Sequence, residues 1–574
     1  MSALTNIPQN VSPCFRHFSP DEAKGRTVFP RDLFRLARKE TNSRFYIFKY
    51  KNVLDIIIVW WYIIFGGFWG KTKPLKNVLY VKGERFAKHA NREFTLDKYK
   101  TSKNTCVLPS AEELKAALRN SGADARANLA ALFDADTFVE LGAFTKRKFC
   151  EYQGLEHDEE LEGVICGYGA VDGRLVYAFA QDGARMKGAL DENHAKKICA
   201  LYDLALKNGA PVVGIFDCAG ADIFEGTAAL AAYSRIMKAV SMASGLIPQV
   251  ALITGNCIGS FATIAAMFDF VIKTKSANFY VTAPAFAGTK DSQAPVTAFA
   301  ADDHGMAVMY ARNLLNYLPD KAGEGVAIEA TADNLNRMLG NRDFGGDVNA
   351  AIAAIADNGI FFETAGDFAP VLTTAFATVG GVKCGFVGTS FMVDEGRITA
   401  SAARKAAKFV DFCDAFSIPL ITLVDSMGLA ICDESENAPF SADLAKLSLA
   451  YAKSTNPKIT VILGHAIGAS FALLGSKALG ADVAYALDDA EIGALSSEAA
   501  VAFAWNNMIS PEKSRDDLIA EWRKSLASPV AAASLGEIDD IVSANELRAR
   551  ICSALMMLAA KGTVRPRLHA VNPL

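Results

Sequence analysis

Two kinds of apolar pattern alternate along the chain from about residue 125 onward. Short unbroken apolar runs such as VVGIFD (212–217), VALITG (250–255), LITLVD (420–425) and ITVILG (459–464) predict buried strands. Between them, apolar residues recur every three or four positions, which is typical of amphipathic helices. These helical stretches cover residues 194–208, 229–244, 403–416 and 442–454. The alternation predicts an α/β fold whose strands are joined by right-handed parallel crossovers.

The whole pattern occurs twice. APVVGIFD (210–217) resembles IPLITLVD (418–425) at an offset of 208 residues, and GNCIGSF (255–261) returns as GHAIGASF (464–471) at an offset of 209. Similar pairs at nearly the same offset run through the rest of the chain. A near-constant offset over so long a span indicates two tandem copies of one domain rather than a solenoid. We therefore expect an internal duplication.

The composition changes near residue 105. Residues 1–105 are poor in alanine and rich in lysine, asparagine and aromatic residues, whereas the remainder is rich in alanine. We therefore predict an unrelated N-terminal extension at 1–105, a first half at 106–330 and a second half at 331–574.

The extension holds one long apolar segment, VLDIIIVWWYIIFGGFWG (53–70). Its length of roughly 18 residues reaches the lower limit for a membrane-spanning helix, and lysines flank both ends. Asp55 and the paired glycines Gly66 and Gly67 argue against a span. Three interpretations stay open: a membrane anchor, a docking segment, and sequence translated upstream of the true start codon. We expect a cytoplasmic protein, associated with a membrane only if this segment is an anchor.

Bulk composition narrows the class of protein further. A chain of 574 residues predicts two or three domains. The net charge of −4 gives no electrostatic reason to expect a nucleic-acid partner. Eleven cysteines occur without a CxxC pair and seven histidines are isolated, so we predict neither a disulfide framework nor a metal site.

Glycine-containing turns follow four of the predicted strands, at 217–226 and 255–266 in the first copy and at 425–431 and 464–475 in the second. Glycine lets a backbone approach a ligand with its N–H groups exposed. Two such N–H groups that converge on a carbonyl oxygen form an oxyanion hole. The alternative is that these glycines only permit close packing of helix on strand; recurrence in both copies favours a site. His465, inside the last turn, is either a ligand contact or an ordinary loop residue.

From about residue 125 to the end, the chain resembles the carboxyltransferase subunits of biotin-dependent acyl-CoA carboxylases, decarboxylases and transcarboxylases. The motifs that carry the resemblance include LFDADTFVELG (132–142), LLNYLP (314–319) and RLHAVNPL (567–574). The resemblance implies two tandem crotonase-like (ClpP/crotonase) halves. It also implies biotin on a separate carrier protein as the cofactor, and a CoA thioester as the substrate.

The resemblance further implies the reaction: a carboxyl group moves between biotin and the α-carbon of an acetyl-, propionyl- or methylmalonyl-type CoA, through an enolate stabilised by backbone N–H groups. One oxyanion hole holds the thioester oxygen and the other polarises the ureido oxygen of biotin. The active site lies between the N-terminal half of one subunit and the C-terminal half of another. By position, the family's site residues fall on Gly220, Ala221, Gly259, Ser260, Gly428, Gly468 and Ala469.

The implied partners are a biotin carboxyl carrier protein, a biotin carboxylase or membrane decarboxylase subunits, and further copies of the chain in a homo-oligomer, expected to be a hexamer. Two departures from the family pattern stand out: Asp222 replaces an arginine and Ser260 replaces a glycine. Two alternatives stay open. One is the carboxyltransferase subunit of a sodium-pumping membrane decarboxylase, which an anchor at 53–70 would favour. The other is a non-catalytic assembly subunit, which the two departures suggest.

Overall fold

The structure, a computed structural model, describes residues 122–147, 161–282, 296–326, 328–340, 344–432, 436 and 439–561. All of them belong to one compact unit, Leu108–Leu574. The extension predicted at 1–105, with its apolar segment 53–70, lies outside the described residues. Within the described part, no helix has both the length and the apolar character that a membrane span requires.

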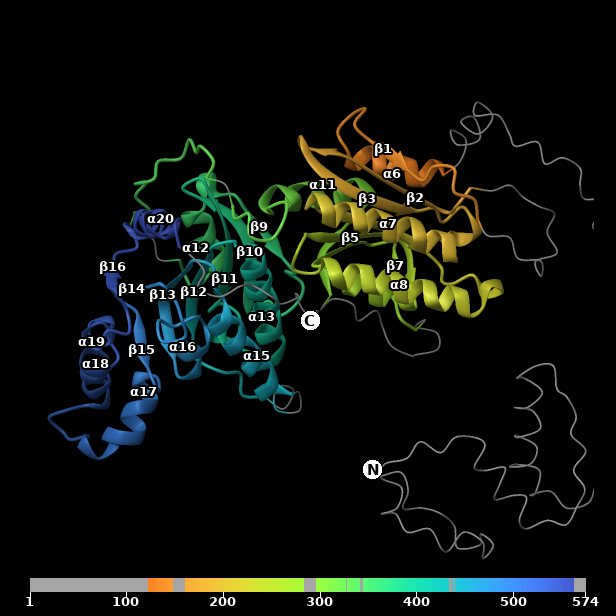
Figure 1. The fold of residues 1–574 in the computed structure, drawn as a ribbon. Coiled ribbons are helices and arrows are strands. Elements are labelled where there is room, and N and C mark those ends of the chain that lie inside the picture. Colours follow the sequence, from red (N-terminus) through yellow and green to blue (C-terminus); the bar gives the residue numbers. More distant parts are fainter. Residues whose placement is uncertain are drawn as a thin grey trace, which may run out of the picture. The chain divides into compact units, whose positions relative to one another are not determined.

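An eight-stranded mixed sheet forms the first half of this unit (Figure 1). Its strands are β1 (Val139–Leu141), β2 (Val164–Val171), β3 (Arg174–Gln181), β4 (Val212–Cys218), β5 (Gln249–Ile258), β6 (Phe270–Thr274), β7 (Asn278–Tyr280) and β8 (Thr297–Ala301). They lie in the order β1-β2-β3-β4-β5-β6-β8, and β7 pairs with the end of β5. The pairs among β1, β2 and β3 are antiparallel, and the others are parallel. The strands predicted at 212–217 and 250–255 are thus confirmed.

A second eight-stranded sheet has the same strand order. Its strands are β9 (Phe361–Thr364), β10 (Leu372–Val379), β11 (Val382–Thr389), β12 (Leu420–Ser426), β13 (Lys458–Ile467), β14 (Val483–Leu487), β15 (Glu491–Gly493) and β16 (Asp540–Val542). They lie in the order β9-β10-β11-β12-β13-β14-β16, and β15 pairs with the end of β13 as β7 does with β5. The predicted α/β class is confirmed, with two sheets rich in parallel pairs.

Each sheet contains one tight hairpin, between β2 and β3 and between β10 and β11. Both central residues of each turn have positive φ: +50° and +78° at Asp172 and Gly173, and +59° and +79° at Gly380 and Gly381. Asp-Gly and Gly-Gly suit such turns because these residues tolerate the left-handed conformation. The crossover pattern does not predict these antiparallel pairs, although the Asp-Gly and Gly-Gly dipeptides that favour such turns are present in the sequence.

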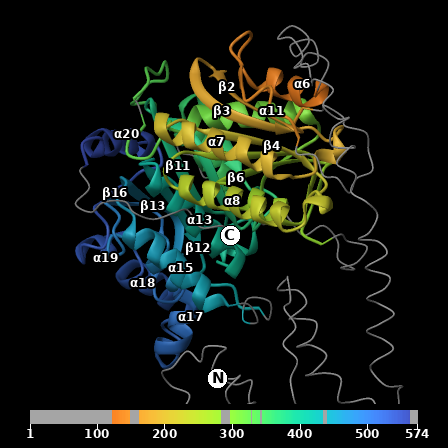
Figure 2. The same cartoon turned by 45° about the vertical axis from the view of Figure 1, so that its right-hand side comes forward.

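The helices predicted from periodicity are confirmed, and their ends differ from the prediction by at most three residues. They are α7 (Glu192–Asn208), α8 (Thr227–Ala243), α13 (Ala400–Ala415) and α15 (Phe440–Lys453). The other described α-helices are α6 (Ala123–Leu132), α9 (Ser260–Ala266), α11 (His304–Tyr317), α12 (Val348–Ile355), α16 (Ala469–Leu473), α17 (Ser497–Ala500), α18 (Arg515–Leu526), α19 (Pro529–Ser534) and α20 (Leu547–Leu558). In both halves, a helix pair lies side by side on one face of the sheet: α7 with α8, and α13 with α15 (Figure 2).

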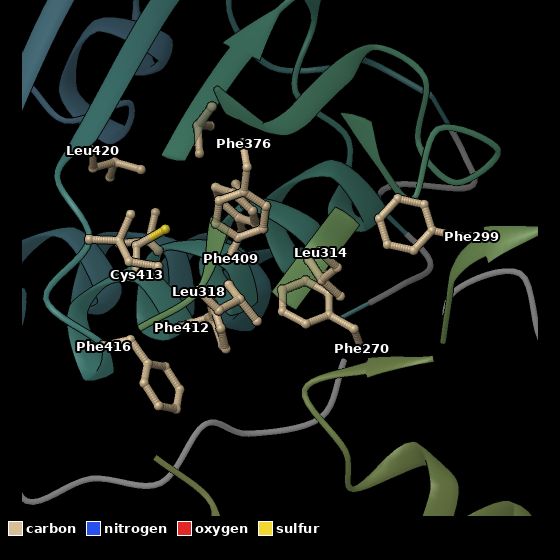
Figure 3. Close-up of a cluster of buried hydrophobic side chains, with 14 of the residues drawn as sticks. Phe270, Phe299, Leu314, Leu318, Phe376, Phe409, Phe412, Cys413, Phe416 and Leu420 are labelled. Carbon is tan, nitrogen blue, oxygen red and sulfur yellow. The ribbon is translucent and has the colours of Figure 1, made fainter. Parts of the chain in front are cut away.

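One hydrophobic core joins the two halves. It contains residues of α6, α11 and the first sheet together with residues of α13, α15 and the second sheet. Phe412 of α13 contacts rings of both halves: its ring centroid lies 4.7 Å from that of Phe270 on β6 and 6.2 Å from that of Phe376 on β10. Figure 3 shows these rings gathered with Phe409 and Phe416. The two halves therefore bury apolar surface against each other within one chain.

Candidate active site in two equivalent pairs of turns

The first turn of the first half follows β4. Gly220 has a φ of +135°, and its carbonyl accepts a hydrogen bond of 2.9 Å from the N–H of Leu190. The N–H of Asp222 in turn donates to the carbonyl of Leu190 at 2.8 Å. Because successive peptide groups of an extended chain point in opposite directions, the N–H between these two bonds, that of Ala221, points away from Leu190.

The turn after β12 repeats this arrangement. Gly428 has a φ of +113° and accepts from the N–H of Ile398 at 2.9 Å, and the N–H of Ala430 donates back to Ile398 at 2.9 Å. The N–H that points away is therefore that of Leu429. The sequence predicts a site residue at Gly428 and none at Leu429, although the offset of 208 residues between the similar segments, applied to Ala221, leads to Leu429.

The second turn of each half ends β5 or β13. Gly259 has φ +64° and ψ −128°, and Gly468 has φ +58° and ψ −130°. These conformations favour glycine. The N–H of Gly259 donates to the carbonyl of Tyr280 at 3.0 Å, and that of Gly468 to the carbonyl of Gly493 at 2.8 Å. Both glycine N–H groups are thus engaged in pairing with β7 or β15.

Ser260 and Ala469 come next and are the first residues of α9 and α16. The first N–H groups of a helix have no acceptor within that helix. The residues predicted for the site therefore divide by their geometry. Glycines set the backbone conformation, and the residue after each glycine presents an N–H group.

The structure brings the predicted residues together in two sets. In the first half, Gly220–Ala221 and Gly259–Ser260 follow β4 and β5, which are adjacent parallel strands. In the second half, Gly428 and Gly468–Ala469 follow the adjacent strands β12 and β13. Each set belongs to its own sheet.

Strand β5 has a kink near residue 255, between the residues that pair with β6 and those that pair with β7. An aspartate at the end of β4 contacts this kink. The β4–β5 register shifts between Phe216 and Cys218, so the residue between them is not paired with a residue of β5. This residue, Asp217, accepts through Oδ1 from the N–H of Asn256 at 2.8 Å. A Cβ on Gly255 would lie 2.2 Å from the carboxyl carbon of Asp217, so any larger residue here would displace this carboxylate.

The second half repeats the kink with a histidine. Asp425 Oδ1 accepts from the backbone N–H of His465 at 2.8 Å and also lies 2.9 Å from its ring nitrogen Nδ1. A Cβ on Gly464 would come within 2.6 Å of the same carboxylate. Phe391 stacks on the imidazole, with ring centroids 4.6 Å apart. The hydrogen bond to Asp425 raises the pKa of His465 above its usual range.

Asp222, one of the two departures from the family pattern, is buried and paired. Its Oδ2 lies 2.6 Å from Arg147 Nη2, and its Oδ1 accepts from the N–H of Phe224 at 3.0 Å. Arg147 also lies 3.7 Å from Asp191. Burial, followed by the charge of Glu162, raises the pKa of Asp191 to about 7. The acid that replaces an arginine therefore has an arginine opposite it, from a segment 75 residues earlier.

A cavity of about 580 Å³ opens beside the His465–Asp425 pair. It lies at the carboxyl ends of β12 and β14, and charged side chains from several elements line it. These are Asp347, Asp425, His465, Asp488, Asp489 and Arg523.

Two sheets with one strand order, each ending in a pair of glycine turns that present backbone N–H groups, define the class of protein: a tandem α/β enzyme scaffold with two candidate oxyanion sites. The chain belongs to the carboxyl transferase family, whose domain model matches residues 122–571.

Individual proteins that the chain resembles support this family assignment. The chain is 35% identical to the methylmalonyl-CoA decarboxylase subunit alpha of Veillonella parvula, over 78% of this chain and 93% of that protein. It is 32% identical to the propionyl-CoA carboxylase beta chain of Cereibacter sphaeroides, over 77% of this chain and 92% of that protein. A solved structure of transcarboxylase 12S, a hexamer with methylmalonyl-CoA and methylmalonic acid bound, superposes with a TM-score of 0.74 at 31% identity, covering 80% of this chain and 96% of that one. The predicted family is confirmed, and the chain is a carboxyltransferase.

Proposed function

We propose that this carboxyltransferase moves a carboxyl group between biotin on a separate carrier protein and the α-carbon of a propionyl- or methylmalonyl-type CoA. The names of the relatives and the ligands of the transcarboxylase 12S structure support this substrate class. The observation that carries the proposal is the repeated pair of outward N–H groups. The reaction has two carbonyl oxygens to stabilise, and the chain has two such pairs.

The donor set fits both ligands. A thioester oxygen and a ureido oxygen are neutral acceptors that gain negative charge during the reaction, and a pair of neutral N–H groups stabilises that charge. We assign Ala221 and Ser260 to the thioester oxygen, and Leu429 and Ala469 to the ureido oxygen. Carboxybiotin, when bound, supplies the carboxyl group and then the base for the α-proton.

Because every proposed donor belongs to the backbone, side-chain changes leave the donors in place. The replacement of a family glycine by Ser260 keeps the N–H group at that position. Loss of one oxyanion donor typically costs roughly 3–4 kcal/mol of transition-state stabilisation in enzymes that have an oxyanion hole. The retained backbone N–H groups favour an active enzyme over a non-catalytic assembly subunit.

We further propose that the two halves arose by duplication, that both are crotonase-like, and that they span 106–330 and 331–574 after an extension at 1–105. The identical strand orders support this. So does a buried lysine at equivalent positions of α7 and α13. Lys197 Nζ donates to the carbonyl of Val164 at 2.6 Å, and Lys405 Nζ donates to that of Leu372 at 2.7 Å.

We infer a homo-oligomer, by similarity to the hexameric transcarboxylase 12S, and a biotin carboxyl carrier protein as partner. A biotin carboxylase or membrane decarboxylase subunits remain the predicted further partners, and a cytoplasmic location remains a prediction.

Purified full-length protein tests the reaction directly. It is incubated with free biotin and, in parallel, malonyl-, methylmalonyl- and glutaconyl-CoA, and loss of the carboxylated thioester is followed with biotin present and omitted. We expect biotin-dependent loss of methylmalonyl-CoA at the highest rate. No biotin-dependent turnover of any of the three by a correctly sized oligomer would contradict the proposal and favour the assembly-subunit alternative.

A further inference from the structure

In each half, an aspartate accepts a hydrogen bond from the backbone of the kink that precedes the second turn. The two halves differ in the side chain that this aspartate contacts. Asp217 meets Asn256, whose Nδ2 lies 3.4 Å from Oδ1, at the limit of a hydrogen bond. Asp425 meets the imidazole of His465 at 2.9 Å. Asparagine cannot change its charge with pH, whereas histidine titrates near neutrality.

The kink is connected to the second-half turn by a short rigid segment. His465, Ala466 and Ile467 pair with Glu491, Ile492 and Gly493 of β15. The next N–H along the chain donates to the carbonyl at the end of that pairing, and the following residue is the proposed donor Ala469. A shift at the kink therefore moves the donor, because no flexible loop lies between them.

A second bond ties the same segment to β12. Ser470 Oγ lies 3.2 Å from the carbonyl of Ser426 and 2.8 Å from that of Ile467. Ser426 follows Asp425 directly, so the aspartate and the proposed donor N–H are fixed to the same strand end.

We propose that Asp425 and His465 are positioning residues for carboxyl transfer, and that they make the second-half turn sensitive to pH while the Asp217–Asn256 pair keeps the first-half turn insensitive. This rests on the proposed function, in which the second-half turn serves biotin and the first-half turn serves the acyl-CoA. The pair acts through the backbone and need not touch either ligand.

Charged groups from three elements act on the imidazole. Asp425 on β12 and Glu491 on β15 favour its protonated form, and Arg523 on α18 opposes it. Asp347, Asp488 and Asp489 line the same cavity. The ring is 30% exposed, so solvent in the cavity is able to exchange its proton.

The direction of the effect follows from these contacts. Since the pKa of His465 is raised, the ion pair with Asp425 is complete below about pH 6.5, the usual value for histidine. It is lost as the pH rises through the higher value in the folded protein. The hydrogen bond then keeps its ionised acceptor, Asp425, but loses the positive charge on its donor, so it holds the kink less firmly.

The test measures kcat/KM for free biotin and for methylmalonyl-CoA between pH 5.5 and 9, in wild-type protein and in His465→Asn, which copies the first half. In the wild type we expect kcat/KM for biotin to fall about fivefold with rising pH through one step above pH 6.5 that kcat/KM for the acyl-CoA lacks. His465→Asn removes that step. Asp425→Asn lowers kcat/KM for biotin at every pH and also removes the step.

The reciprocal exchange, Asn256→His, provides the converse result. It should introduce a step into kcat/KM for methylmalonyl-CoA and leave the biotin step in place. His304→Asn, the same chemical change on α11 outside both turns, is the matched control and should leave both profiles unaltered. Persistence of the biotin step in His465→Asn would overturn the proposal.

A readout that needs no turnover separates this proposal from the proposed function. The difference in Tm between wild type and His465→Asn should be largest near pH 6 and shrink toward pH 9, because the wild type loses its ion pair. If this difference in Tm decreases toward pH 9 but biotin supports no turnover, the proposed reaction is wrong, whereas the pH-dependent contact between Asp425 and His465 is confirmed. If turnover is normal and the difference is constant with pH, the pair is not a switch and this proposal is wrong.

Discussion

Helices α7 and α13 occupy equivalent places in the two halves, yet they differ in burial. Seven of the 17 residues of α7 are buried, whereas 13 of the 16 residues of α13 are. Helix α7 is an ordinary amphipathic surface helix. Helix α13 is covered on a second side as well, because the core that joins the halves lies over it.

One pair of equivalent positions on the two helices shows this difference in burial. Leu204 of α7 is 36% exposed, and Phe412, its counterpart on α13, is 2% exposed. Phe412 packs against Phe270 from the first half. The two sheets share one strand order, but at this helix position the second half carries a larger apolar side chain, which contacts the first half.

The largest effect is expected where this contact is removed. Phe412→Ala deletes a buried ring that packs on both halves, so we expect the free energy of unfolding to fall by about 3–5 kcal/mol. Thermal unfolding measures the change. We also expect the first and second halves to lose their mutual protection, which hydrogen exchange of peptides from β6 and β10 detects.

Leu204→Ala is the matched control, since the same helix position in the first half faces partly toward solvent. It should cost about 1 kcal/mol or less, because little apolar area is lost from the core. Equal losses for the two variants would mean that α13 is not the main contact between the halves.

The elements of the fold were largely predictable from the sequence. Periodicity gave α7, α8, α13 and α15, and apolar runs gave β4, β5, β12 and β13, because each has a strong local pattern. The hairpin turns at Asp172–Gly173 and Gly380–Gly381 also have a clear local signal, in their dipeptides. No local sequence pattern indicates that α13 is more buried than α7. Its burial depends on contacts between residues far apart in the sequence, such as Phe270 and Phe412.

The site was predictable to the level of the turn but not of the atom. Glycine turns pointed to Gly220, Gly259, Gly428 and Gly468. The roles of their N–H groups depend on partners far along the chain, such as Gly493 for Gly468. The Asp425–His465 contact likewise follows from the adjacency of β12 and β13. Arg147 opposite Asp222 is a contact that no local pattern indicated.

The next largest effect tests the proposed donor directly. Ala469→Pro removes one N–H while keeping the helix, because proline is well tolerated at the first helical position. We expect kcat for biotin-dependent decarboxylation of methylmalonyl-CoA to fall about 100- to 1000-fold. The oligomer size by light scattering should not change.

Ala469→Gly keeps the N–H and serves as the control, with kcat expected within about threefold of wild type. Ser260→Pro makes the same deletion in the first half and should give a similar loss if both turns hold an oxyanion. Full activity of Ala469→Pro in a well-folded oligomer would show that the second-half turn is only structural. A loss in one half alone would show that the two turns have diverged in function.

The smallest effect concerns the caps of the two compared helices. Asp191 caps α7 by accepting from the N–H of His194, and Thr399, at the equivalent position, caps α13. The pKa of Asp191 is raised to about 7, mainly by burial, so the folded protein binds a proton there that the unfolded chain releases near pH 4. The stability from that proton is complete below pH 4 and is lost as the pH rises to about 7.

Asp191→Thr gives the first half the cap of the second and removes this titration. We expect the stability of the variant relative to wild type to rise by about 2–3 kcal/mol between pH 5 and pH 8, measured as the difference in Tm at each pH. Asp191→Asn, which keeps the shape and the cap without the charge, should behave in the same way. If both variants differ from wild type by a constant amount across this range, Asp191 is ionised throughout and its pairing with Arg147 outweighs its burial. The first half would then hold a permanent ion pair beside Asp222 where the second half has a neutral cap, and the two halves would differ in fixed charge rather than in titration.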